Sequence, residues 1–285
     1  MGCKLRYFKY LIPTNRESIP MKDCFRLLTL NCFGGYLPNT SRRLLALAQE
    51  LEQRPHQVVC LQEIQLHRYQ KLLIKACASY PYSFYEPYLQ CPKGGLLTLA
   101  RIPMSKHFES YSEQGLWCTP MLMDRILHKG MLIHQLSWTG IPLVIINTHI
   151  LANYVGDWDR HGLYSRVEEK QLQQLATTVQ RQPADSIVIV VGDFNIPRGT
   201  KLYYDLLANA GLSDPLSGDA RPTLRVPPGI PSRFSLPIDY VLIRIPSAYA
   251  LSIDCDLCLS KKYQMGGWRQ DYLSDHIGLE LRLEK

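Results

Sequence analysis

The chain has 285 residues, 46% of them hydrophobic, which is enough to bury the core of one large α/β domain or of two small ones. Its net charge of +7 favours anionic partners such as nucleic acid, phosphorylated metabolites or acidic lipid surfaces, although the scattered Lys and Arg residues also suit ordinary solubility. No run of roughly 18 apolar residues is present, which excludes a predicted membrane-spanning helix.

The cysteines predict a reducing compartment. There are nine, an odd number without regular spacing, and several lie inside apolar runs. This usage is typical of reduced thiols in a protein core. Because no charged, apolar and small-residue signal pattern opens the chain, we expect a cytoplasmic protein.

The first 22 residues differ from the rest of the chain. They have no clear hydrophobic period and contain Pro13 and Pro20. No later break in composition divides the sequence. We therefore expect an irregular leader over residues 1–22 and a single domain over residues 23–285.

Four helices are predicted from apolar stripes and end signals. The first follows the candidate caps Asn39, Thr40 and Ser41 and ends before Pro55. The others are expected over residues 69–78, 166–180 and 200–209, with Gly211 ending the last.

Short apolar runs predict the strands. They cover residues 25–30, 57–61, 94–100, 130–136, 143–146, 187–191, 238–243 and 277–281. Strands and helices alternate, but some strands follow each other without a helix between them. This order predicts an α/β fold with two packed sheets flanked by helices.

Most of these strands stop or start on polar side chains. The residues concerned are Asn31, Glu63, His149, Asp193, Asn195, Asp239, Asp275 and His276. Asp193 and Asn195 follow a strand that reads as buried on both faces, and period two would place them on one side of it. Taken alone, Asp-x-Asn could equally be a turn. A set of buried carboxylates, however, requires a cation or shared protons to be tolerated.

Six motifs in order resemble one family. They are Thr29-Leu30-Asn31-Cys32, Leu61-Gln62-Glu63-Ile64, Asn147-Thr148-His149, Gly192-Asp193-Phe194-Asn195, Ile238-Asp239-Tyr240 and Ser274-Asp275-His276. This series is similar to the signature of the endonuclease/exonuclease/phosphatase superfamily, the deoxyribonuclease I fold. The resemblance implies a four-layer α/β sandwich of two mixed sheets packed face to face, with helices outside and the site at the edge of both sheets.

The residue types suit metal-assisted hydrolysis of a phosphodiester. Glu63 is the best candidate ligand for Mg²⁺, or for Mn²⁺ in its place, because these ions take oxygen ligands. Asn31 and Asp275 are expected to help. The metal would act as a Lewis acid on the phosphate.

His149 and His276 are the candidate acid and base, since histidine titrates near neutrality. The resemblance implies that His276 takes the proton of the attacking water while Asp239 fixes its tautomer. His149 would stabilise or protonate an oxygen of the substrate. Asp193 and Asn195 would orient the water and hold the phosphate, and Asp193 competes with His276 for the role of base.

The substrate is left open. The segment after His149 resembles the sphingomyelinase branch more than the nuclease branches, so a phospholipid phosphodiesterase is favoured over a DNA or RNA nuclease. Tyr263, Met265 and Trp268 lie beside lysines and could enter a bilayer interface. The same composition also suits nucleic acid or a plain surface loop. A binding scaffold without catalysis is a remote alternative, because no matched position is lost.

Overall fold

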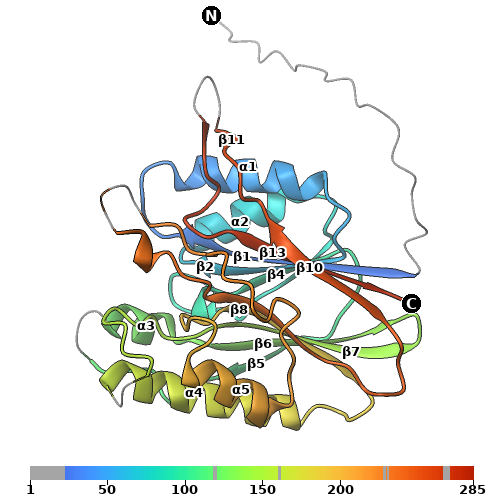
Figure 1. Cartoon of the computed structure of the whole chain (residues 1–285). Coiled ribbons are helices and arrows are strands. Elements are labelled where there is room, and N and C mark those ends of the chain that lie inside the picture. The colour runs from blue at the N-terminus through green and yellow to red at the C-terminus, as the bar shows by residue number, and fades with distance from the viewer. Residues whose placement is uncertain (1–22, 118–120, 160–161, 227–228, 230, 266–269) are drawn as a thin grey trace, which may run out of the picture.

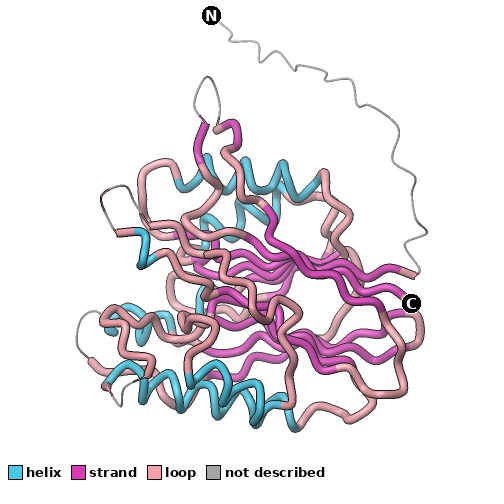
Figure 2. The backbone as a smooth tube through the Cα atoms, in the orientation of Figure 1, coloured by secondary structure: helices cyan, strands magenta, loops and turns pink. Residues whose placement is uncertain are grey.

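Two β-sheets face each other and helices cover their outer surfaces (Figures 1 and 2). The computed structural model describes residues 23–117, 121–159, 162–226, 229, 231–265 and 270–285. The expected leader, residues 1–22, lies outside the described residues. Its separation from a single domain over residues 23–285 therefore stays a prediction.

The first sheet has six strands in the order β10-β13-β1-β2-β4-β3. Its strands are β1 (Cys24–Gly34), β2 (Val58–Ile64), β3 (Tyr82–Phe84), β4 (Leu97–Ala100), β10 (Ser252–Cys258) and β13 (Gly278–Glu284). Among these described strands, only β1 and β2 pair in parallel. Helices α1 (Thr40–Glu52) and α2 (His67–Ala76) pack on this sheet through one apolar cluster.

The second sheet has five strands in the order β5-β6-β7-β8-β9. Its strands are β5 (His107–Ser110), β6 (Gly130–Trp138), β7 (Ile141–His149), β8 (Ile187–Asp193) and β9 (Asp239–Arg244). Of the strand pairs described here, only β7 and β8 are parallel. Helices α4 (Leu163–Gln180) and α5 (Lys201–Ala210) cover the sheet. Two mixed sheets with outer helices confirm the predicted fold class.

Smaller elements lie in the loops. They are α3 (Met121–Leu127), the 3-10 turns η1 (Lys93–Gly95) and η2 (Ser232–Phe234), and the hairpin of β11 (Tyr263–Gln264) and β12 (Gln270–Asp271). Within the described ranges, no helix has both the length and the hydrophobicity needed to cross a bilayer.

The core between the sheets explains how the site is placed. Phe25 and Leu27 of β1 are fully buried in one cluster with Ile145 of β7 and Ile189 of β8. The two central strand pairs are parallel, so each pair brings two carboxyl ends to the same edge. The polar residues that follow these strands therefore meet at one end of the sandwich.

The strand predicted over residues 94–100 begins later. Gly94 and Gly95 have φ of 65° and 68°, and they form the turn η1 before β4 starts at Leu97. A Cβ on Gly95 would lie 3.3 Å from the Cα of Glu63. The two glycines therefore form a turn that passes close to the backbone of Glu63, and they are not part of the strand.

The predicted membrane contact of Tyr263 and Met265 is wrong. Each side chain is 6% exposed and belongs to the apolar cluster under α1, together with Leu44 and Leu273. These side chains pack inward because the hairpin lies against the helical side of the first sheet. Trp268 lies outside the described residues.

Candidate active site

Glu63 is held at the end of β2 by a strained backbone. Its φ is 57°, in the left-handed region that costs a non-glycine residue about 1–3 kcal/mol. Gly34 makes room for this turn, since a Cβ there would lie 2.2 Å from the carbonyl oxygen of Glu63. Gly34 and Gly95, from two other segments, thus lie against the backbone of Glu63. Backbone strain of this kind is common at functional sites.

One amide group joins the half-buried carboxylate of Glu63 and the buried carboxylate of Asp193. Asn31 Nδ2 donates to Glu63 Oε1 at 3.1 Å and to Asp193 Oδ2 at 2.9 Å. Burial raises the pKa of Glu63, and burial together with the carboxylate of Asp239 raises the pKa of Asp193 to about 7. Asn31 Oδ1 accepts the N–H of Phe33 at 3.0 Å, so the amide nitrogen faces the carboxylates in this structure.

Asn195 reaches the same side as Asp193, but not by continuing the strand. Strand β8 ends at Asp193, and Asn195 has a left-handed φ of 54°. Its N–H donates to Asp193 Oδ1 at 2.9 Å, and its Nδ2 donates to the carbonyl of Ile150 at 3.1 Å. The same Nδ2 lies 3.3 Å from Nε2 of His149. A local turn, and not period two, therefore brings these side chains together.

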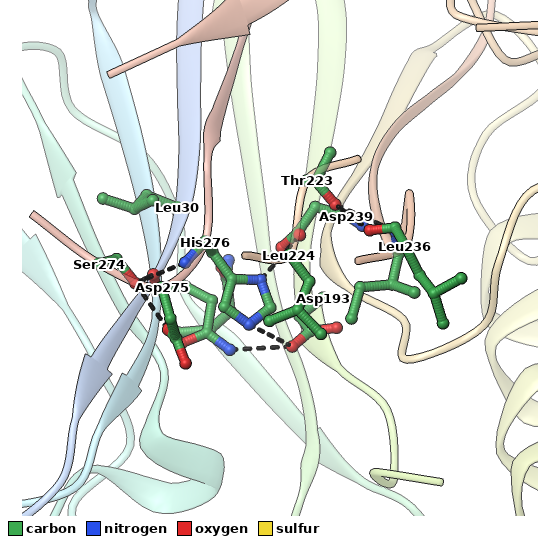
Figure 3. A network of polar contacts seen from close by, with 12 residues as sticks. Leu30, Asp193, Thr223, Leu224, Leu236, Asp239, Ser274, Asp275 and His276 are labelled. Atoms are coloured by element: carbon green, nitrogen blue, oxygen red, sulfur yellow. Dashed lines mark hydrogen bonds and ion pairs between the residues drawn. The ribbon is translucent and has the colours of Figure 1, made fainter. Parts of the chain in front are cut away.

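His276 lies between two carboxylates (Figure 3). Its Nδ1 is 2.8 Å from Asp239 Oδ2, and its Nε2 is 3.7 Å from Asp193 Oδ2. Burial by itself would lower the pKa of His276, but the charges of Asp239 and Asp193 raise it to about 10. Thr223 Oγ1 accepts the N–H of Asp239 at 3.0 Å and so holds that residue in place.

His149 has the opposite electrostatic environment. Burial, the positive charge of Lys129 and the neighbouring His276 hold its pKa well below the ordinary range. Its Nε2 lies 3.5 Å from Asp193 Oδ2, while its buried Nδ1 has no hydrogen-bond partner among the described residues. The site thus combines a neutral imidazole and a charged one on either side of Asp193.

Asp275 faces a different space. It lines a cavity of about 450 Å³ together with Phe33, Arg43, Arg225 and Tyr272. Burial raises the pKa of Asp275, and its charge in turn contributes to the raised pKa of Glu63. It is thus a close electrostatic neighbour of the central carboxylates.

The central donor set fits a hard divalent cation. Ligand atoms of Glu63, His149 and Asp193 lie within 4.8 Å of one another, and so do those of Asp193, Asp239 and His276. The pKa values of Glu63 and Asp193 stay raised although the positive charge of His276 partly compensates both carboxylates, and a bound cation would supply further positive charge. Carboxylate oxygens are the ligands that Mg²⁺ prefers.

Two supporting features were not predicted from the sequence. Lys129 is 1% exposed, and its Nζ donates to the carbonyl of Ile150 at 2.7 Å and pairs with Asp124 at 2.6 Å. Gln62 Nε2 donates to Asn147 Oδ1 at 2.7 Å and so joins the two sheets. The position of Gln62 and Asn147 at strand ends could have identified them as site residues from the sequence. The sequence does not mark Lys129 in this way, because lysines are rarely buried.

Comparison with known proteins identifies the family. A family model described as "Endonuclease/Exonuclease/phosphatase family" matches residues 28–276. The chain belongs to the endonuclease/exonuclease/phosphatase family. The resemblance predicted from the six motifs is thereby confirmed.

Two curated relatives act on sphingolipids according to their names. Over 167 residues the chain is 32% identical to the inositol phosphosphingolipids phospholipase C of Saccharomyces cerevisiae, covering 57% of this chain and 34% of the relative. Over 129 residues it is 25% identical to the sphingomyelinase C of Listeria ivanovii, covering 43% of this chain and 35% of the relative. The chain spans about a third of the length of the curated relatives it matches.

Solved structures share the fold at low identity. TDP2 of D. rerio, complexed with a single-strand DNA product, has a TM-score of 0.69 and 19% identity, covering 92% of this chain and 99% of that chain. The beta toxin of Staphylococcus aureus, with bound magnesium ions, has a TM-score of 0.69 and 16% identity, covering 91% of this chain and 99% of that chain. At these identities the comparison shows the fold alone.

Proposed function

We propose that the protein is a Mg²⁺-dependent phosphodiesterase whose substrate is a sphingophospholipid. The observation that carries the chemistry is the contact of Glu63 and Asp193 with one amide, between a neutral and a charged histidine. The sphingolipid substrate is supported by the names of the two curated relatives. The six motifs that predict the site are all intact, which argues against a binding scaffold.

In this proposal Glu63 is the principal metal ligand and Asn31 contacts it directly, while Asp275 would assist through its charge from the neighbouring cavity. When bound, Mg²⁺ or Mn²⁺ would neutralise charge on the phosphoryl oxygens. Asn31 Oδ1 accepts the N–H of Phe33 with one lone pair, and its second lone pair would be its contribution to a metal. Asp193 stands next to these ligands and completes the acidic centre.

The protein's own groups would move the protons. Asp239 holds Nδ1 of His276, so Nε2 is the atom that faces Asp193 and the attacking water. Because its raised pKa keeps His276 charged in this state, Nε2 would take the proton of the water only after giving up its own, which the charge of a bound cation would favour. Asp193 is the alternative base. Asn195 would hold the phosphate, and His149 would stabilise a substrate oxygen from the other side of Asp193.

A panel of substrates tests the proposal. It contains sphingomyelin vesicles, lysophospholipid, plasmid DNA, abasic duplex DNA and a soluble aryl phosphodiester, each with metal-stripped protein and with added Mg²⁺ or Mn²⁺. We expect metal-dependent hydrolysis of sphingomyelin and of the soluble diester. Cleavage of DNA alone would replace the lipid substrate by the nuclease alternative, and no metal-dependent turnover of any diester would refute the chemistry.

A further inference from the structure

Five exposed apolar residues lie on two neighbouring loops and at the start of α4, next to the candidate active site. We call them the mouth patch: Leu116, Trp117, Tyr154, Val155 and Leu163, with exposed fractions of 44%, 73%, 63%, 63% and 48%. Single exposed apolar residues are ordinary on protein surfaces, whereas a group of them marks an interaction surface.

Shared packing beneath the patch holds its loops together. Met121, Leu151 and Val167 form one buried cluster, and Tyr164 packs against it. The N–H of Leu116 approaches the Sδ of Met121 at 3.5 Å, and the ring of Tyr154 meets that of Tyr164 edge-on at 6.3 Å. Leu163 is the first residue of α4 and precedes Tyr164, so the two loops and the start of this helix rest on one base.

The patch borders the catalytic centre. Its base residue Leu151 follows His149 by two positions, and Ile150 between them accepts hydrogen bonds from Lys129 and Asn195. The ring of Tyr154 is partly covered by Tyr164, and this partial burial, together with the charges of Asp124, Glu63 and Asp193, raises the pKa of Tyr154 to about 12. The phenol of Tyr154 is therefore within electrostatic range of the carboxylates of Glu63 and Asp193. A bilayer in contact with Tyr154 would therefore lie within electrostatic range of Glu63 and Asp193.

The chemistry of the patch fits a lipid surface. The guanidinium of Arg125 lies 4.3 Å from the centre of the Trp117 ring, and its Nη1 donates to the carbonyl of Gly115 at 2.7 Å. An indole with aliphatic neighbours and a cation beside it suits the boundary between acyl chains and phosphate headgroups. The net charge of +7 adds long-range attraction to anionic lipids.

We propose that the mouth patch docks the active-site edge of the protein onto a phospholipid bilayer. This inference rests on the proposed function, because docking at the mouth patch would present a headgroup phosphodiester to Glu63 and Asp193. It also replaces the hairpin contact expected from the sequence, because Tyr263 and Met265 are buried.

Cosedimentation of the full chain with vesicles tests the docking separately from catalysis. The vesicles contain phosphatidylcholine and phosphatidylserine without sphingomyelin, and no divalent cation is added. The test variant is Trp117→Ala with Val155→Ser. The matched control is Leu45→Ser with Tyr204→Ser, two apolar residues of α1 and α5 that are 43% and 59% exposed.

We expect the test variant to lower the partition coefficient about tenfold and the control to leave it unchanged. Both variants should hydrolyse the soluble aryl phosphodiester at the wild-type rate. Equal partitioning of the two variants, or no vesicle binding by the wild type, would overturn the proposal. So would a dimer in lipid-free sedimentation that the test variant abolishes, because it would assign the patch to a second copy. Failure to hydrolyse any diester would refute the proposed function and leave the binding result standing.

Discussion

Nδ1 of His276 lies 2.8 Å from Oδ2 of Asp239, and both side chains are buried at the meeting point of the two sheets. The first residue precedes β13 of one sheet, and the second begins β9 of the other. The bond leaves Nε2 of His276 directed at Asp193 (Figure 3). A contact between the two sheets therefore fixes the direction of one imidazole, and the charge of Asp239 helps to keep it protonated.

The variant Asp239→Asn should keep the fold and lose activity. An amide in place of the carboxylate removes a charge that raises the pKa of His276, and once the imidazole is neutral the NH₂ can turn toward Nδ1 and leave the proton on Nε2. We expect kcat on a soluble phosphodiester to fall by about 10²–10⁴-fold. Near-ultraviolet circular dichroism checks the fold, and Asp254→Asn on the exposed strand β10 is the control. A rate within a few-fold of the wild type would show that Asp239 does not orient His276.

The variant Glu63→Gln should separate metal binding from stability. Burial raises the pKa of Glu63, so the neutral amide should stabilise the metal-free protein at neutral pH. The same change should remove the rise in Tm on adding Mg²⁺, which corresponds to about 2.7 kcal/mol at 100 times Kd for a protein that binds the ion.

Differential scanning calorimetry with and without Mg²⁺ measures both effects. The control is Glu169→Gln on the surface of α4, which should keep the response to Mg²⁺. If Glu63→Gln responded to Mg²⁺ as the wild type does, another residue would be the principal ligand.

Strand ends are the part of the site that sequence can predict, because a series of polar residues placed directly after buried apolar runs is rarely needed for folding alone. Glu63, His149 and Asp193 are predictable in this way. The turn at Asn195 is not, since its left-handed backbone depends on bonds to Asp193 and Ile150. Local sequence does not encode such tertiary contacts.

Burial of amphipathic side chains is a second limit. The composition around Tyr263 and Met265 is the same whether the hairpin faces solvent or α1, so the sequence prediction placed them on the wrong side. Lys129 is a similar case, because its partners Asp124 and Ile150 are set by the packing of α3. The exposed position of Trp117 also follows only from the fold.

Gly192 should tolerate no side chain. Its φ is 140°, and a Cβ there would lie 1.9 Å from the carbonyl oxygen of Thr148 on the neighbouring strand. Gly192→Ala would therefore push β7 and β8 apart just below His149 and Asp193. We expect the free energy of unfolding to fall by about 3 kcal/mol or more.

Gly140→Ala is the matched control for steric contact. Gly140 also has a positive φ, 83°, but a Cβ there would meet none of the described residues within 4 Å. Only backbone strain of about 1 kcal/mol is expected. Urea unfolding of both variants gives the comparison, and equal losses would show that contact with Thr148 is not what requires the glycine.

Glu168 should make the protein less stable as the pH rises. It is fully buried on α4, and Asn153 Nδ2 donates to its Oε2 at 2.9 Å, while its Oε1 has no hydrogen-bond partner among the described residues. Burial raises its pKa from 4.5 to about 8. Its protonated form is favoured in the folded state, so its contribution to stability is complete below about pH 4.5 and is lost as the pH rises through about 8.

Glu168→Gln mimics the protonated acid and removes this titration. The variant should therefore raise Tm at pH 8 and change it little at pH 4.5, because the wild-type carboxyl is already protonated at the lower pH. Thermal unfolding of wild type and variant across this range measures the difference. A gap that stays constant with pH would show that the pKa of Glu168 is the same in the folded and unfolded states.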